Sequence, residues 1–437
     1  MLKTTLSYHN HGMVEDCYGI NLRHLQRMAE QFYGDDDLTI WMPHTDTARG
    51  PSHPRPRLLP STCAVMHKAI TILMLKLECQ VIDRNPDFKM QDRDFLRRIN
   101  WEKGTVMVNG REYPMRDMSF PTVDPADPTA LNSDEKVVLQ KLVQSFRQSE
   151  KLQQHVEFLY AKGSVYHIEN GNLLYHGAVP MTKKGSFAVE RFEGHAYSGR
   201  ALMDYCDERA RRGYFAPEGS AARQSGQDFL WYLWCGKLSP LYGRSAMTTF
   251  ERLYVEDAST HTEVKDPYYT WYNEEAVCRR ILAEFGLPGT SHIVNGHVPV
   301  QEKKGESPIK GGGRLVVIDG GFCRAYHEKT GIAGYNAGLF QPHHVPAHPP
   351  ALRERRKGCE RESGHPLPEE HPRDGEPPHP RGGDRRGRDP AGEGPRPQTA
   401  GPGLSAGLDQ GDPLRRQCVV SSGKCKIFLK IRDKIRG

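Results

Sequence analysis

Two histidines, each placed after an apolar run and next to a glycine, are the residues of this chain best suited to chemistry. The first lies in residues 171–180, Gly-Asn-Leu-Leu-Tyr-His-Gly-Ala-Val-Pro, and the second in residues 292–300, His-Ile-Val-Asn-Gly-His-Val-Pro-Val. A buried strand that ends at an imidazole places a neutral nitrogen ligand at the rim of a sheet, and the glycine allows close approach. Because the pattern occurs twice, it predicts that His176 and His297 bind one metal ion.

A carboxylate follows a third apolar run. Residues 314–318 are followed by Asp319 and two glycines, and open sheets place their chemistry at the ends of strands. A lone histidine after a strand is more often a structural residue. The repeated His-Gly pairing and the carboxylate favour a site, with Asp319 as a candidate at its rim.

The segment that follows His297 is basic and rich in glycine. It carries Lys303, Lys304 and Lys310, and Arg324 lies a little further along the chain. Cations and backbone N–H groups in such a segment can contact phosphate, so these four residues are candidates for substrate binding. The spacing does not match a P-loop, and a solvated hairpin loop is the alternative.

The elements that must position these residues change type along the chain. Residues 1–165 are predicted to be mainly helical. One helix buries Met66, Ile70, Leu73 and Leu77 on a single face, and another begins with a capping box at Asn132 and ends at Gly163. Short glycine-bounded runs then predict strands at 164–168, 173–175, 292–295 and 314–318, with a helix over 274–285. This order predicts an α/β fold.

The composition of residues 336–437 differs from that of the rest. These 102 residues contain 15 Pro, 15 Gly and only two aromatic residues, which predicts a disordered tail. The tail carries 19 Lys and Arg against 13 Asp and Glu, a net charge of +6 that equals the charge of the whole chain. Residues 1–335 are therefore formally neutral, and the tail has almost no aromatic rings to stack bases, which argues against nucleic acid as a partner.

Ten cysteines are scattered without a CxxC pair, which is typical of reduced thiols in a cytosolic protein. There is neither an apolar signal core at the start nor an apolar run long enough to span a bilayer. We therefore expect a soluble, cytoplasmic protein that does not contact a membrane.

Several motifs in sequence order resemble class 3 (Firmicutes-type) fructose-1,6-bisphosphatase across residues 6–335. They lie at 15–23, 171–180, 228–234, 247–252, 295–310 and 317–335. The resemblance implies a calcineurin-like metallophosphatase fold, a dinuclear manganese centre, and hydrolysis of fructose 1,6-bisphosphate to fructose 6-phosphate and phosphate in gluconeogenesis. It makes His176 and His297 imidazole ligands of one metal, leaves the role of Asp319 open and assigns no catalytic residue.

Three family motifs, DxH, GDxxDRG and GNHD, do not occur here, and they would supply the acidic ligands that two divalent ions require. Three adjacent aspartates at 35–37 lack the spacing to replace them. We therefore expect an N-terminally truncated chain with a frameshift near Tyr335. The expected fold is the C-terminal half of a metallophosphatase β-sandwich. Residues 1–165 form a large helical insertion, 166–335 the α/β half-domain and 336–437 an out-of-frame tail.

Three functional hypotheses follow. The first is an active sugar bisphosphatase whose site is completed by a separately encoded N-terminal fragment. The second is a catalytically inactive fragment of a disrupted bisphosphatase gene. The third is nucleic-acid binding through the basic tail.

Overall fold

The computed structural model describes residues 1–43, 58–320, 335, 421–422 and 425–426. One compact unit comprises Met1–Leu339 and Arg416–Gly437, and a second unit, Phe340–Arg415, lies outside the described residues. The predicted disordered tail therefore also lies outside them, apart from two short antiparallel strands, β11 (Ser421–Ser422) and β12 (Cys425–Lys426). No helix in the described ranges is long and apolar enough to cross a membrane.

The first part of the chain is built mainly of helices. They are α1 (Leu2–Ser7), α2 (Gly12–Tyr18), α3 (Arg23–Tyr33), α4 (Pro60–Arg84), α5 (Ser133–Gln148) and α6 (Glu150–Lys162). Short 3-10 helices lie at η1 (Thr39–Trp41), η2 (Pro86–Phe88), η3 (Gln91–Arg93) and η4 (Leu96–Arg98). Helix α4 starts with Pro60, which is favoured in a first helical turn because its missing N–H is not needed there.

Helix α4 is buried on more than the one face expected from its apolar spacing. Besides the apolar residues, Lys68, Lys76 and Glu78 are each at most 3% exposed. Lysine and glutamate are normally exposed to solvent, and a sequence pattern predicts them there. Here ion pairs replace that water, and α4 is a central helix of the first core.

The predicted capping box is present at the start of α5. The Glu135 N–H donates to the Asn132 side chain at 2.8 Å, and the Asn132 N–H donates to the Glu135 carboxylate at 2.9 Å. The single helix expected from Asn132 to Gly163 is divided, however. Ser149 adopts an extended conformation and separates α5 from α6, which ends at Gly163 as predicted.

A small sheet interrupts the helical region and was not predicted. Strands β1 (Ile99–Asn100), β2 (Thr105–Val108) and β3 (Arg111–Pro114) pair antiparallel in that order. Asn109 and Gly110, with φ of 49° and 78°, form the turn between β2 and β3. An Asn-Gly pair is the strongest short-range hairpin signal because both residues tolerate positive φ.

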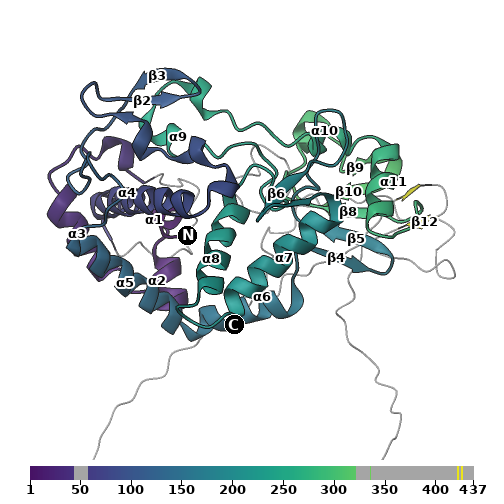
Figure 1. Ribbon diagram of the computed structural model, residues 1–437, viewed down its shortest axis with the longest axis horizontal. Coiled ribbons are helices and arrows are strands. Elements are labelled where there is room, and N and C mark those ends of the chain that lie inside the picture. Colours follow the sequence, from purple (N-terminus) through teal and green to yellow (C-terminus); the bar gives the residue numbers. More distant parts are fainter. Residues whose placement is uncertain (44–57, 321–334, 336–420, 423–424, 427–437) are drawn as a thin grey trace, which may run out of the picture. The chain divides into compact units, whose positions relative to one another are not determined.

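The second part contains a five-stranded sheet with the order β4-β5-β8-β10-β9 (Figure 1). The strands are β4 (Tyr166–Glu169), β5 (Asn172–Tyr175), β8 (Ile293–Asn295), β9 (Ile309–Lys310) and β10 (Leu315–Val317). Strands β5, β8 and β10 are parallel neighbours, and β4 and β9 are antiparallel edges. All four predicted strands are present, which confirms the α/β class.

The second part of the chain also contains several helices. They are α7 (Gly199–Phe215), α8 (Ala221–Cys235), α9 (Glu251–Tyr254), α10 (Tyr268–Trp271) and α11 (Glu275–Glu284), with a hairpin of β6 (Glu190–Phe192) and β7 (His195–Tyr197) and the 3-10 helices η5 (Ala258–His261), η6 (Glu302–Lys304) and η7 (Gly311–Gly313). Helix α11 matches the predicted helix, whereas α7 and α8 were missed. These two lie side by side (Figure 1), and a Cβ on Gly213 would stand 2.4 Å from the Gly226 Cα. Only glycine permits this approach.

Two hydrophobic cores result. The first joins α1 to α5 with Phe250, Tyr254 and Val255, so a segment from late in the chain packs among the early helices. The second joins the apolar strands of the five-stranded sheet to α7, α8, α10 and α11. The division of the chain at residue 165 stays a prediction.

Candidate metal-binding site at the sheet edge

The parallel strands β5, β8 and β10 bring the three predicted site residues to one edge of the sheet. Tyr175 on β5 and Val317 on β10 both lie opposite Asn295 on β8, and the carboxyl ends of parallel strands meet at the same edge. His176 follows β5 directly, while His297 and Asp319 each lie two residues beyond the end of their strands. Residues more than a hundred positions apart thus share one rim.

The two histidines contact each other through their rings. The His176 Nε2 lies 2.9 Å from the His297 Nδ1, and the ring centroids are 4.7 Å apart. The His297 Nε2 lies 2.8 Å from the backbone carbonyl oxygen of Tyr242. A carbonyl oxygen can only accept a hydrogen bond, so this geometry assigns the proton of a neutral His297 to Nε2. The Nδ1 lone pair therefore faces His176.

Both imidazoles favour the neutral form. Burial lowers the pKa of His176, and the negative charge of Asp319 opposes this shift. Burial also lowers the pKa of His297, and the nearby His176 lowers it further. Because each histidine is shifted below its ordinary value, both are neutral at pH 7, the state in which imidazole binds metals.

Asn295 holds the backbone that follows His176. Its side chain is 1% exposed, and its amide Nδ2 donates to the carbonyl oxygens of Gly177 at 2.8 Å and His176 at 3.2 Å. The Gly296 N–H also donates to the His176 carbonyl at 3.1 Å. Sequence reasoning assigned no role to Asn295, although a buried asparagine ending an apolar strand is a signal of such a hydrogen-bonding role.

Backbone geometry around the pair is tight. A Cβ on Gly177 would lie 2.2 Å from the carbonyl oxygen of Pro240, so the glycine predicted to allow close approach does so toward protein backbone. His297 has φ of 65°, in the left-handed region that is unfavourable for a residue with a Cβ. Strain of this kind is concentrated at functional sites.

The nitrogen positions fit two imidazoles on one cation. Metal–nitrogen bonds of about 2.1 Å at right angles place the two nitrogens about 3.0 Å apart, and the observed separation is 2.9 Å. The Tyr242 carbonyl matches the partner that a metal-bound histidine ordinarily has on its other nitrogen. Within the described ranges the carboxylate of Asp319 does not complete a three-ligand group with them, since His9, His11 and Cys63 are the only such group within 4.8 Å.

The predicted phosphate-binding lysines lie on the segment after His297. Lys303 and Lys304 belong to η6 and are exposed. The Lys310 Nζ contacts the Glu306 carboxylate at 2.9 Å and lies over the Tyr272 ring. Lys310 is therefore already engaged by an acid, and Arg324 lies outside the described residues.

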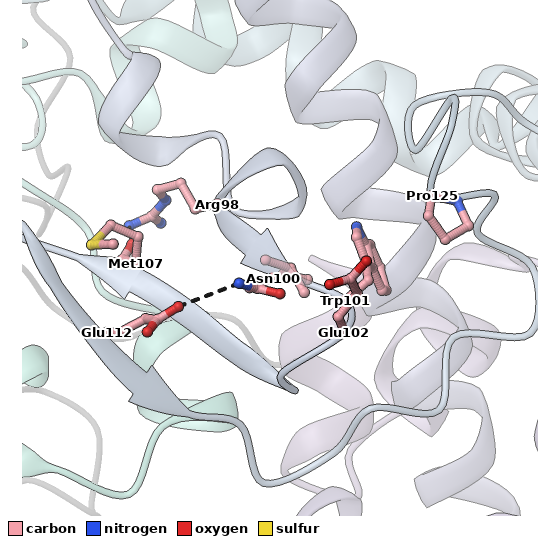
Figure 2. Close-up of a pocket in the computed structure, with 8 residues that line it drawn as sticks. Arg98, Asn100, Trp101, Glu102, Met107, Glu112 and Pro125 are labelled. Carbon is pink, nitrogen blue, oxygen red and sulfur yellow. Dashed lines mark hydrogen bonds between the residues drawn. The ribbon is translucent and has the colours of Figure 1, made fainter.

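A surface hollow lies among other residues. It has a volume of about 560 Å³ and is bordered by Arg98, Ile99, Asn100, Trp101, Glu102, Met107, Glu112 and Pro125. Figure 2 shows these side chains around the β1–β3 sheet, with Asn100 Nδ2 3.4 Å from Glu112 Oε1. None of the predicted site residues borders this hollow.

Fold and site together define an α/β protein with two neutral imidazoles at the ends of adjacent parallel strands. The family model of the Firmicute fructose-1,6-bisphosphatases matches residues 1–343, and the chain belongs to this family. The resemblance found in the sequence motifs is thus confirmed. No solved structure matches the chain.

Curated relatives carry the same name. The chain is 45% identical over 352 residues to "Fructose-1,6-bisphosphatase class 3" of Clostridium novyi (strain NT), which covers 79% of this chain and 52% of that protein. It is 46% identical over 338 residues to the protein of that name from Alkaliphilus metalliredigens (strain QYMF), covering 77% and 50%, and 46% identical over 352 residues to that of Porphyromonas gingivalis (strain W83), covering 79% and 53%. The chain thus spans about half the length of these relatives.

Proposed function

We propose that this chain acts in the hydrolysis of fructose 1,6-bisphosphate to fructose 6-phosphate and phosphate, a step of gluconeogenesis. The observation that carries the proposal is the His176–His297 pair, 2.9 Å apart at the ends of parallel strands, in a chain 45% identical to proteins named for this activity. The five-stranded sheet would be part of a metallophosphatase sandwich.

The metal proposed for this site is a divalent cation, Mn²⁺ by family resemblance. When bound, such an ion polarises the phosphoryl group and lowers the pKa of a coordinated water. His176 and His297 would hold it through Nε2 and Nδ1. Two neutral imidazoles do not offset the charge of a cation, so carboxylates must complete the site. Asp319 is the candidate at the sheet edge, because its charge is felt by both histidines.

Neighbouring groups of the protein hold the two histidines in position. The Tyr242 carbonyl fixes the His297 ring with Nδ1 toward His176, and Asn295 fixes the carbonyl of His176. For both facing nitrogens to act as ligands, the proton on the His176 Nε2 would have to move to the His176 Nδ1, which keeps the imidazole neutral. Preorganised ligands lower the reorganisation cost of metal binding.

Substrate phosphates would contact the basic segment. Lys303 and Lys304 on η6 are exposed residues, and lysine binds phosphate as a point charge. Lys310 would join them only by leaving Glu306, and Arg324 is proposed from its place in the sequence alone.

The test combines two measurements on the full chain. Mn²⁺ should raise the Tm and support phosphate release from fructose 1,6-bisphosphate, and both effects should be lost in His176→Ala and His297→Ala. His195→Ala, an exposed histidine on β7, is the matched control and should behave as wild type. Phosphate release that persists in the two histidine variants, or is absent from the wild-type chain with Mn²⁺, would contradict the proposal.

A further inference from the structure

A second group of metal-ligand side chains lies in the helical region. His9 and His11 lie in the turn between α1 and α2, and Cys63 lies in the first turns of α4. The exposed fractions are 7% for His9 and 0% for both His11 and Cys63. One potential ligand atom from each residue lies within 4.8 Å of those of the other two. Two imidazoles and a thiol, brought together across fifty residues, are a donor set for a borderline-soft cation.

The two ring nitrogens of each histidine have different surroundings. The His11 Nδ1 lies 3.5 Å from the Cys63 sulfur, while its Nε2 faces the Glu15 carboxylate at 4.0 Å. The His9 Nε2 lies 2.9 Å from the carbonyl oxygen of Leu58, so that nitrogen is the donor in a neutral ring, and Nδ1 is the atom that would bind an ion. Carboxylates and carbonyls on the outer nitrogen are the ordinary surroundings of a metal-bound histidine.

The distance between Cys63 and His11 also fits a shared ion. Zinc–sulfur and zinc–nitrogen bonds of about 2.3 Å and about 2.1 Å, at the tetrahedral angle, place sulfur and nitrogen about 3.6 Å apart. The observed separation is 3.5 Å. All the potential ligand atoms lie within 4.8 Å of one another, and rotation of the His9 ring can bring its nitrogen to the tetrahedral separation.

We propose that His9, His11 and Cys63 form a zinc-binding site separate from the His176–His297 pair. Zn²⁺ forms bonds with one nitrogen of each histidine and with the Cys63 sulfur, and the thiol proton passes to solvent as the sulfur–metal bond forms. Water takes the fourth position. The ion joins the α1–α2 turn to α4, so its role is structural.

The same residues would form an ordinary buried S–H···N hydrogen bond without metal. Cobalt substitution separates the two interpretations, because Co²⁺ bound by a thiolate gives a near-ultraviolet charge-transfer band that imidazole ligands alone do not give. The full-length chain, stripped of metal and titrated with Co²⁺, should develop this band with one ion per chain. Zn²⁺ should then displace the cobalt and remove the band.

Two cysteines on α4 supply matched variants. Cys63→Ser should abolish the charge-transfer band, whereas Cys79→Ser should retain it, because Cys79 is equally buried but contacts Asp94 instead of a histidine. His176→Ala should also retain the band, which separates this site from the proposed Mn²⁺ site. A wild-type chain without the band, or a band that survives Cys63→Ser, would overturn the proposal.

A second measurement covers the case in which Cys63→Ser does not fold. Zn²⁺ should raise the Tm of the metal-stripped wild-type chain, and His9→Gln should lose at least tenfold in zinc affinity measured by competition with a chelator. His9 is the least buried of the three residues, so its substitution disturbs the core least. Wild-type zinc affinity in His9→Gln would also overturn the proposal.

Discussion

Polar groups are arranged in opposite ways in two regions of this protein, the buried helical core and the edge of the five-stranded sheet, where His176 is exposed and His297 half-buried. In the helical core, cations meet anions: Lys68 contacts Asp36 and Asp117, and Lys76 contacts Glu135 at 2.8 Å. At the edge of the five-stranded sheet, His176 meets His297, and both would carry positive charge if protonated. The opposite charges of an ion pair compensate each other without a bound ligand. Two neutral imidazoles with facing nitrogens share a proton or, as proposed, bind one cation in its place.

This contrast distinguishes buried ion pairs that stabilise the fold from the histidine pair proposed to bind a metal ion. A buried ion pair is costly to break because the remaining partner stays in the core without compensation. The proposed ligand pair should contribute little to folding, because its role depends on a bound ion. The three variants below test the contrast, starting with the ion pairs.

Replacing Lys76 by methionine should have the largest effect on stability. The Lys76 Nζ donates to the carbonyl oxygens of Thr122 and Ala130 and to the Glu135 carboxylate. Lys76→Met leaves two carbonyls without this donor and the buried Glu135 carboxylate with only the Asn132 N–H, so the free energy of unfolding should fall by about 3–5 kcal/mol. Urea unfolding at pH 7 measures this change.

A double variant provides the control. Lys76→Met with Glu135→Gln removes both charges and keeps an amide in the capping box with Asn132, so it should recover part of the loss. If the single Lys76→Met variant is as stable as wild type, the Lys76–Glu135 ion pair does not stabilise the fold. The contrast between ion pairs and the histidine pair would then fail.

Replacing Asn295 by leucine should have an intermediate effect on stability and a second effect on the metal. The change removes the donor to the carbonyls of His176 and Gly177 at nearly constant volume, which should cost about 1–3 kcal/mol. It also loosens the His176 turn, so Mn²⁺ affinity should fall about 10–100-fold. Thermal shift as a function of Mn²⁺ concentration gives the affinity.

Asn172→Leu is the matched control for this variant. Asn172 is also buried, and its amide also donates to backbone carbonyls, but it lies at the start of β5. It should lose stability and keep the wild-type response to Mn²⁺. An equal loss of Mn²⁺ affinity in both variants would mean that Asn295 acts only through general stability.

Local patterns predicted the sheet and its edge well. Glycine-bounded apolar runs predicted β5, β8 and β10, and parallel pairing then brought His176 and His297 together. The sequence did not predict the features that depend on contacts between residues far apart along the chain. The Tyr242 carbonyl reaches His297 across 55 residues, and no local pattern indicates such a contact. Lys76 was not predicted to be buried because its partners lie on other elements.

One local signal was also overlooked because the surrounding region had been assigned as helical. The Asn109-Gly110 pair marks a hairpin, yet residues 1–165 were assigned as mainly helical and the β1–β3 sheet was missed. The capping box at Asn132 was correct, but nothing in the sequence indicated that Ser149 would divide the helix. The sequence could not predict the group of His9, His11 and Cys63. The two histidines come close to the cysteine only through the packing of α1, α2 and α4.

Replacing His297 by glycine should have the smallest effect on stability and the largest on metal binding. Relief of the left-handed conformation at φ of 65° should return about 1–2 kcal/mol, and loss of the hydrogen bond to Tyr242 should cost about 1 kcal/mol. The two nearly cancel, so the free energy of unfolding should stay within about 1 kcal/mol of wild type. His297→Ala keeps the strain and should be less stable than His297→Gly by about 1 kcal/mol. Neither variant should retain the Mn²⁺-induced rise in Tm.

If His297→Gly unfolds as readily as Lys76→Met, the imidazole is a structural group like the lysine. If it is as stable as wild type but no longer responds to Mn²⁺, the strained histidine serves binding and not folding.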